Sequence, residues 1–169
     1  MKILYLVRHA KSDWGNENIS DIDRPLNNRG YRDAHLMSSL MKEKKIHPDL
    51  IISSPAVRAV STALVFCRNL NLSYSDILIN HNLYQTTLKQ YVEIVTQFDN
   101  RFNTIMLFAH NPVISDLANF LTAPVMESMP TCCVTGIRPQ ADCNDWKNFS
   151  GQKGELFFYD LPKNHNGIR

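Results

Sequence analysis

Short apolar segments recur along the chain and alternate with segments of helical spacing. The apolar runs cover residues 3–7, 50–52, 77–79 and 105–108. A run of this length is typical of a strand buried on both faces of a mostly parallel sheet. The segments between the runs carry apolar residues three and four positions apart, which is typical of amphipathic helices. The alternation predicts an α/β fold, a three-layer α/β/α sandwich with a mostly parallel sheet.

Four helices are predicted from their starting residues. The first begins after a capping asparagine at position 27 or 28. The second covers about 56–70 and follows Ser54-Pro55, a capping residue with proline at the first helical position. The third covers about 88–98, and the fourth follows Asn111-Pro112.

The last part of the chain has a different pattern. Residues 131–138 and 155–160 are predicted strands without a comparable helix between them, so we expect them to pair antiparallel. Residues 139–153 are mostly polar and predict a loop, since Pro139 cannot donate to a strand ladder. The chain has 169 residues and no linker or repeat, which predicts a single domain over 1–169.

Composition excludes several classes of protein. Hydrophobic residues make up 44% and charged residues 20%, which is typical of a globular domain. Eighteen Lys and Arg against sixteen Asp and Glu leave a net charge of only +2, so we expect no nucleic-acid partner. The run at 3–7 is too short for a signal peptide or a membrane span, which predicts a cytoplasmic protein without a membrane partner. The four cysteines show no CxxC spacing, so we expect reduced thiols and no metal.

Candidate chemistry lies where the apolar runs end. Arg8 and His9 close the first run, and Ala109-His110-Asn111-Pro112 follows the run at 105–108. The carboxyl ends of parallel strands form the edge where open α/β sheets bind ligands. Arg58 lies in the first turn of the second helix, and its side chain leans back towards the same edge. Two arginines and two histidines without a carboxylate cluster suit a phosphoryl group.

Three sequence blocks in this order resemble a known family. Leu6-Val7-Arg8-His9-Ala10 resembles the Arg-His-Gly signature of the histidine phosphatase superfamily, residues 53–63 resemble its second block, and 109–112 resemble its third. Lys11-Ser12-Asp13-Trp14 and Asp23-Arg24-Pro25-Leu26 are similar to the small SixA-type phosphohistidine phosphatases in particular. The resemblance implies a phosphoglycerate-mutase-like fold and phosphoryl transfer without metal or cofactor, through a phosphohistidine on the enzyme.

The resemblance also implies a role for each matching residue. His9 becomes the nucleophile, and Arg8, Arg58 and His110 surround the phosphate, with Ala109 and Asn111 beside them in the binding set. Neutral imidazole is a nucleophile at neutral pH, and covalent catalysis divides one displacement into two. Fixed cations stabilise charge on the transferring oxygens, and an anionic ligand favours the protonated form of His110.

The chain departs from the family pattern at three positions. Ala10 and Ala109 stand where glycine is usual, and we expect both to be tolerated because they are small, unless the backbone there needs a positive φ. Gln85 stands in the region where many members carry a proton-donating acid, and an amide cannot do that work.

The segment 11–26 has neither helical nor strand period and is expected to form a lid or wall over the site. It supplies Asp13, Asp21 and Asp23 as candidate proton donors. The alternative is that these acids are solvated or pair with Arg24 and Lys11. Trp14 either packs over the site or anchors the loop.

The sequence therefore favours a metal-independent phosphatase that acts on protein phosphohistidine through a covalent intermediate on His9. A phosphatase of a small phosphorylated metabolite and a non-catalytic phosphate-binding module are the alternatives. Retention of His9 disfavours the binding module, and the short chain disfavours a mutase. We expect a monomer, and we expect the histidines outside the motifs to be surface residues: His35, His47, His81 and His165.

Overall fold

A six-stranded sheet forms the centre of the described protein. The computed structural model describes residues 1–15, 17–123, 126–139, 144–151 and 154–165. The sheet has the strand order β3-β2-β4-β1-β5-β6. The first four strands in this order are mutually parallel, and β5 is antiparallel to both of its neighbours. The strands are β1 Ile3–Arg8, β2 Leu50–Ser53, β3 Ile77–Ile79, β4 Thr104–Ala109, β5 Val134–Pro139 and β6 Gly154–Asp160.

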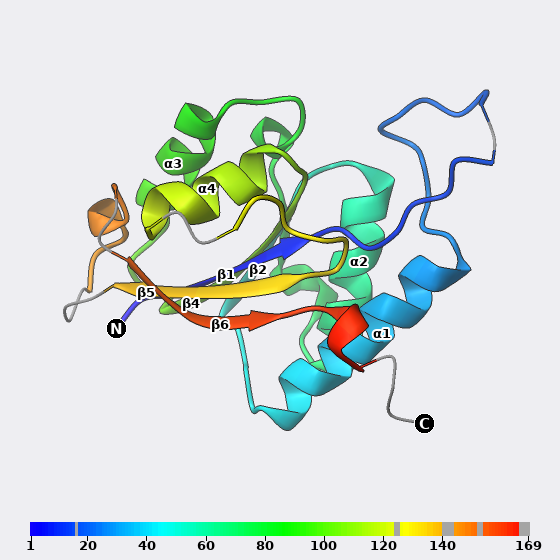
Figure 1. Cartoon of the computed structure of the whole chain (residues 1–169). Helices are drawn as coiled ribbons and strands as arrows, with labels where there is room; N and C mark the ends of the chain where they lie inside the picture. The colour runs from blue at the N-terminus through cyan, green and yellow to red at the C-terminus, as the bar shows by residue number, and fades with distance from the viewer. Residues whose placement is uncertain (16, 124–125, 140–143, 152–153, 166–169) are drawn as a thin grey trace.

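Helices cover both faces of the sheet (Figure 1). On one face, α1 (Asn28–Glu43) packs against α2 (Val57–Asn69). On the other face, α3 (Leu88–Thr96) packs against α4 (Val113–Leu121). The predicted three-layer α/β/α sandwich with a mostly parallel sheet is therefore confirmed.

Side-chain alternation along the strands divides the core into two clusters. In β1, Leu4 and Leu6 face the cluster under α3 and α4, whereas Tyr5 and Val7 face the cluster under α1 and α2. All four side chains are almost fully buried. Because successive residues of a strand point to opposite faces, a strand covered on both sides is a continuous apolar run. This explains why the sequence pattern found the central strands.

The ends of several elements differ from the prediction. Asn27 caps α1 as expected, by accepting a hydrogen bond from the Gly30 N–H at 2.8 Å. Ser54 is not the cap of α2: the helix begins at Val57 after Ala56, which provides no side-chain cap. The hydroxyl of Ser54 instead contacts His110.

The C-terminal strands pair antiparallel, as predicted. β5 begins at Val134 rather than at residue 131. The predicted loop at 139–153 contains a 3-10 turn, Trp146–Asn148, whose tryptophan is completely buried, while 140–143 and 152–153 lie outside the described residues. Burial of this indole stabilises the segment, which the polar composition of the segment did not predict.

The isolated histidines and cysteines follow the prediction with one correction. His35, His47 and His81 are exposed, but His165 is partly buried and its Nε2 lies 2.8 Å from a carboxylate oxygen of Asp160. Free thiols are found at all described cysteines, and Cys143 lies outside the described residues. The described cysteines are Cys67, Cys132 and Cys133.

Candidate functional site

His9 stands directly after β1, and its hydrogen bonds assign its tautomer. Its Nδ1 lies 2.7 Å from the carbonyl oxygen of Ala10, so Nδ1 must carry the proton and donate it. Its Nε2 accepts a hydrogen bond from Nε of Arg58 at 3.3 Å. Burial, together with the positive charges of the pocket arginines, lowers the pKa of His9 from 6.5 to about 4. The side chain is therefore a neutral imidazole with its lone pair on Nε2 at neutral pH.

Arg8, the last residue of β1, lines the same pocket as His9. Its Nη1 donates to the carbonyl oxygen of Met129 at 2.7 Å. Its Nε is buried without a partner among the described residues. A buried unpaired donor is costly, so this one fits a site that an anion fills.

Arg58 reaches the pocket from the first turn of α2, as the sequence predicted. The residue is 5% exposed. In addition to its contact with His9, its Nη1 donates to the carbonyl oxygen of Asp21, and its Nη2 donates to the carboxylate of Asp21 at 2.9 Å. These contacts fix the direction of the guanidinium beside the His9 ring.

His110 follows β4, and its ring centre lies 5.0 Å from that of His9. Its Nε2 lies 2.7 Å from the hydroxyl of Ser54, and its buried Nδ1 has no partner among the described residues. Burial and then the neighbouring His9 and Arg58 lower its pKa to about 3. If the Ser54 hydroxyl donates to Nε2, the neutral ring keeps its proton on Nδ1. His110 then offers a donor to an anion without the positive charge that the sequence analysis expected a ligand to induce.

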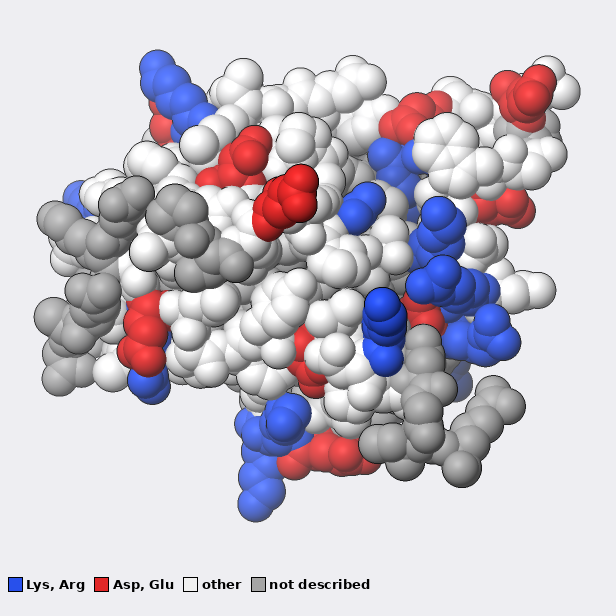
Figure 2. Space-filling model, viewed as in Figure 1, with Lys and Arg blue, Asp and Glu red and all other residues white. Residues whose placement is uncertain are grey.

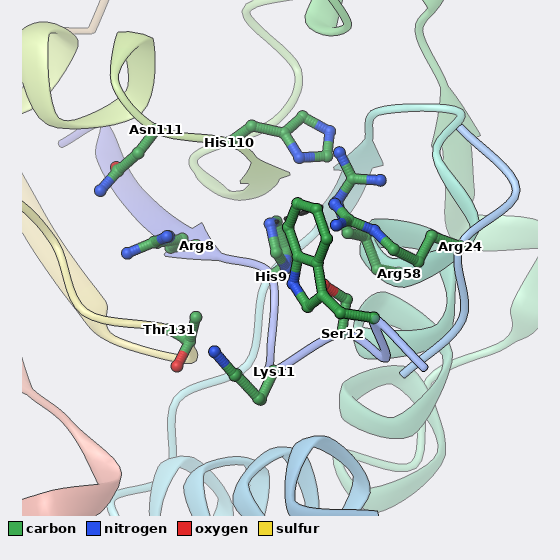
Figure 3. A pocket seen from close by; sticks show the side chains of 10 residues that line it. Arg8, His9, Lys11, Ser12, Arg24, Arg58, His110, Asn111 and Thr131 are labelled. Carbon is green, nitrogen blue, oxygen red and sulfur yellow. Dashed lines mark hydrogen bonds between the residues drawn. The ribbon is translucent and has the colours of Figure 1, made fainter. Parts of the chain in front are cut away.

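The four side chains meet at one pocket of about 280 Å³ (Figure 3). The pocket lining contains cationic side chains and no carboxylate. On the molecular face drawn in Figure 2, by contrast, acidic and basic side chains are mixed. Three guanidinium groups share one carboxylate, that of Asp21, which pairs with Arg24 and Arg58 from outside the pocket lining. The remaining positive charge attracts an anion and matches the oxygens of a phosphoryl group. The lining residues are Arg8, His9, Lys11, Ser12, Trp14, Arg24, Arg58, His110, Asn111 and Thr131.

The two remaining members of the predicted binding set occupy different positions. Asn111 lines the pocket, but its Nδ2 donates to the Ser128 hydroxyl at 2.7 Å and to the Met129 carbonyl at 2.9 Å, which holds the loop that also binds Arg8. Ala109 is completely buried, and its carbonyl oxygen accepts from the N–H of His9 at 3.1 Å. Ala109 therefore joins the ends of β1 and β4 and is not part of the pocket lining.

Alanine is unstrained at both positions where the family pattern has glycine. The described non-glycine residues with positive φ do not include Ala10 or Ala109. The Ala10 N–H donates to the hydroxyl of Thr62 at 3.0 Å. Substitution by a small L-residue is therefore compatible with the backbone here.

Arg24 is the site residue that the sequence analysis missed. It is 8% exposed, lines the pocket, and has both Nε and Nη1 buried without partners among the described residues. Its guanidinium carbon lies 3.5 Å from the ring centre of Trp14, which is 70% exposed. The indole covers one face of the guanidinium and leaves its edges for an anion. The only signal in the sequence was the block at 23–26, which does not show where the side chain points.

The segment 11–26 forms a wall of the pocket, as expected. Its two ends meet through a β-bridge between Ser12 and Leu26. The α1 helix supports it, because the Asn27 N–H donates to the Lys11 carbonyl oxygen at 3.0 Å. Lys11, Ser12, Trp14 and Arg24 of this wall all line the pocket.

The three candidate acids of this segment have different contacts. Asp13 is exposed and accepts from the Gly15 N–H at 2.8 Å, and Asp23 is exposed and accepts from the Ser20 hydroxyl at 2.6 Å. Asp21 instead contacts Arg58, Arg24 and Tyr84. Among the three, only Asp21 lines a cavity of the site.

That cavity adjoins the phosphate pocket. It has a volume of about 240 Å³ and shares Arg58, His110 and Asn111 with the pocket. Gln85, in the region where many members of the resembled family carry an acid, lines it, and its Nε2 lies 3.4 Å from the Tyr84 hydroxyl. The neighbouring walls include apolar side chains from Leu83 and Val113. The cavity thus continues the pocket towards the loop that carries Gln85.

Two further findings concern the described residues as a whole. Within the residues that the structure describes, no group of three or more His, Cys, Asp or Glu side chains could hold a metal ion. No helix in the same part of the chain is long and apolar enough to cross a membrane.

Fold and site together define a class: α/β proteins with a cation-lined pocket at the carboxyl edge of the parallel strands, beside a histidine whose Nε2 is unprotonated. The model of the histidine phosphatase superfamily (branch 1) matches residues 4–110. The chain belongs to this superfamily.

Individual relatives agree with this assignment. “Putative phosphoserine phosphatase 2” of Hydrogenobacter thermophilus is 32% identical over 133 residues, which are 78% of this chain and 58% of that protein. The chain thus spans little more than half the length of this relative. The crystal structure of the “putative phosphohistidine phosphatase SixA” from Agrobacterium tumefaciens has a TM-score of 0.79 at 24% identity, covering 95% of this chain and 98% of that one. A SixA protein histidine phosphatase complexed with tungstate has a TM-score of 0.81 at 19% identity, covering 96% and 99%.

Proposed function

We propose that this protein is a phosphatase that removes a phosphoryl group from a protein phosphohistidine through a covalent phosphohistidine on His9. The observation that carries the proposal is the unprotonated Nε2 of His9, which accepts only from Arg58 among the described residues, at a pocket lined by cations and no carboxylate. Superfamily membership and the fold shared with SixA-type proteins support it.

The donors of the pocket suit a phosphoryl group in the act of transfer. Arg8 and Arg24 each have a buried donor without a partner among the described residues, Nδ1 of His110 is buried and likewise unpaired there, and Arg58 contacts the nucleophile itself. Nε2 of His9 attacks phosphorus, the bond to the leaving group breaks, and its electron pair leaves with that group. Fixed donors stabilise the charge on the phosphoryl oxygens and need no rearrangement.

The residues around the leaving group favour phosphohistidine as substrate. An alkoxide leaving group needs a proton in the transition state, which Gln85 cannot supply. Asp21 is also a poor donor. Partial burial alone would raise the pKa of Asp21, but the hydrogen bonds from Tyr84 and Arg58 outweigh it and lower the pKa. A phosphorylated imidazole ring can be protonated near neutral pH and then leaves as a neutral group, so it requires little assistance.

Covalent labelling tests the nucleophile. Wild-type protein treated with radiolabelled phosphoramidate should carry an acid-labile, base-stable label. His9→Ala should lose the label and turnover, whereas His81→Ala, which replaces an exposed histidine, should keep both. Normal labelling of His9→Ala would show that another group accepts the phosphoryl.

A substrate panel tests the leaving group. We expect wild type to prefer a phosphohistidine protein to alkyl phosphates such as phosphoserine and phosphoglycerate. Gln85→Glu should gain mainly on the alkyl phosphates, since a carboxylic acid can donate the missing proton. Equal kcat/KM of wild type on both classes would contradict the assigned substrate.

A phosphatase of a small phosphoester is the second candidate. The name of the relative from Hydrogenobacter thermophilus and the 240 Å³ cavity beside the phosphate pocket favour it. Under this alternative, free phosphoserine or a similar metabolite would be the best substrate in the panel. A single domain over 1–169, a monomeric state and a cytoplasmic location stay predictions that accompany either function.

A further inference from the structure

The carboxylate of Asp21 lies at the junction of the two cavities of the site. Its Oδ2 accepts from Arg58 at 2.9 Å and from the Tyr84 hydroxyl at 2.8 Å, and its Oδ1 accepts from Arg24 at 2.8 Å. Its side chain nevertheless remains 49% exposed. The carboxylate is thus fixed in direction by three partners and still open to water.

Asp21 contacts the same guanidinium as the nucleophile. Arg58 donates through Nε to His9 and through Nη2 to Asp21. The guanidinium group is planar and rigid, so it fixes the carboxylate relative to Nε2 of His9. Among the described residues that line the pocket or the adjoining cavity, Asp21 is the one carboxylate.

The second half of the proposed reaction needs a group of this kind. In an in-line displacement the attacking water occupies the side of phosphorus that the first leaving group has vacated. The cavity that accommodates the leaving group therefore also admits the water. This water must lose a proton as it bonds to phosphorus, and an ionised carboxylate can accept it, whereas the amide of Gln85 cannot.

We propose that Asp21 is the general base that hydrolyses the phosphoenzyme, an inference that rests on the proposed covalent intermediate on His9. The water oxygen bonds to phosphorus as the bond between phosphorus and Nε2 breaks, and the electron pair of that bond returns to Nε2. The water proton passes to the Asp21 carboxylate and then to solvent through its exposed side. Inorganic phosphate and the unmodified enzyme result.

The surroundings of Asp21 match this task. The charged or titratable groups facing it are Arg24 of its own loop, Arg58 of α2, Tyr84 and His110. Hydrogen bonds from Tyr84 and Arg58 keep the carboxylate ionised despite its partial burial. Tyr84 acts as a positioning residue, because its hydroxyl donates to the Oδ2 that also binds Arg58.

Rapid-quench kinetics on the intact chain separate the two half reactions. Wild type, Asp21→Asn and Asp23→Asn are mixed with radiolabelled phosphoramidate, and formation and decay of the acid-labile label are measured. General bases typically contribute about 10²–10⁴-fold, so label on Asp21→Asn should decay at least about 100-fold more slowly than on wild type. Formation of the label should change by less than about tenfold, because the nucleophile and the arginines remain. Asp23→Asn, whose carboxylate contacts Ser20 instead, should match wild type in both steps.

Several outcomes decide the inference. Accumulation of label on Asp21→Asn with partial recovery of decay in Asp21→Glu would support the base. Decay on Asp21→Asn at the wild-type rate would overturn the base assignment and leave the covalent mechanism intact. Equal slowing of formation and decay would also overturn it, because it would mean that Asp21 only positions Arg58. If neither wild type nor any variant forms the label, the covalent mechanism is wrong, and the assignment of Asp21 as its general base is wrong as well.

Tyr84→Phe adds a readout that a merely structural role would not give. Loss of the hydrogen bond from Tyr84 should raise the pKa of Asp21. Protonated Asp21 cannot accept the proton of the attacking water, so the fall in the decay rate at low pH should begin at a higher pH than in wild type. An unshifted limb would contradict the involvement of Asp21.

Discussion

Acidification should destabilise this fold through the two histidines of the pocket. Burial and neighbouring positive charges lower the pKa of His9 from 6.5 to about 4 and that of His110 from 6.5 to about 3. In the unfolded chain both rings titrate near 6.5, so below that pH the unfolded state binds more protons than the folded state. The free energy of unfolding therefore falls as pH drops from 6.5 towards the folded pKa values.

The size of this effect follows from proton linkage. Each histidine contributes about 1.36 kcal/mol per pH unit between its unfolded and folded pKa, so moving from about pH 7.5 to about pH 5.0 costs about 2 kcal/mol per ring. Together the two rings account for about 4 kcal/mol, a large part of the stability of a typical domain. The penalty exists because the fold buries both rings, and because the arginines of the pocket add positive charge beside them.

Urea unfolding at both pH values measures the loss. His110→Asn should recover about half of it, because the amide cannot be protonated in either state. His47→Asn, which replaces an exposed histidine outside the pocket, should show the wild-type pH dependence. An equal loss in wild type and His110→Asn would refute the assignment of a neutral His110 with a lowered pKa.

Three further outcomes are expected. Arg24→Met should lower kcat/KM at least about 100-fold, because a fixed donor is lost, whereas Arg101→Met, outside the pocket lining, should leave it unchanged. Wild-type activity of Arg24→Met would show that Arg24 does not take part in the site. Gly30→Ala should lower the free energy of unfolding by about 1–3 kcal/mol. Its Cβ would lie 2.2 Å from the carbonyl oxygen of Lys11, and an unchanged Tm would contradict this clash. Tungstate should alter the emission of Trp14, which stacks on Arg24, and Trp14→Phe should abolish the change; a persisting signal would place the reporter elsewhere.

The sequence alone determined the layers of the fold and the four central site residues. A parallel strand buried on both faces needs a continuous apolar run, so the central strands were visible as Leu4–Val7 and its equivalents. His9 and His110 end two such runs, and neighbouring parallel strands bring their carboxyl ends together without further information. Arg58 followed from the start of a helix and the backward lean of helical side chains.

Only the tertiary structure decided the contribution of the loop 11–26. Nothing in the local pattern distinguishes Asp21 from Asp13 and Asp23, because all three are acids in a segment without a period. Asp21 is selected by Arg58 and Tyr84, which lie 37 and 63 positions away in the sequence. Arg24 likewise enters the pocket because Trp14 covers its guanidinium.

The protonation states were also a tertiary result. The intrinsic pKa of histidine leaves the charge near neutral pH open. Burial beside Arg8, Arg24 and Arg58 makes His9 neutral, and the carbonyl oxygen of Ala10 fixes which nitrogen holds the lone pair. Periodicity and motifs locate a side chain along the sheet edge, whereas its charge and tautomer depend on the atoms that the fold packs around it.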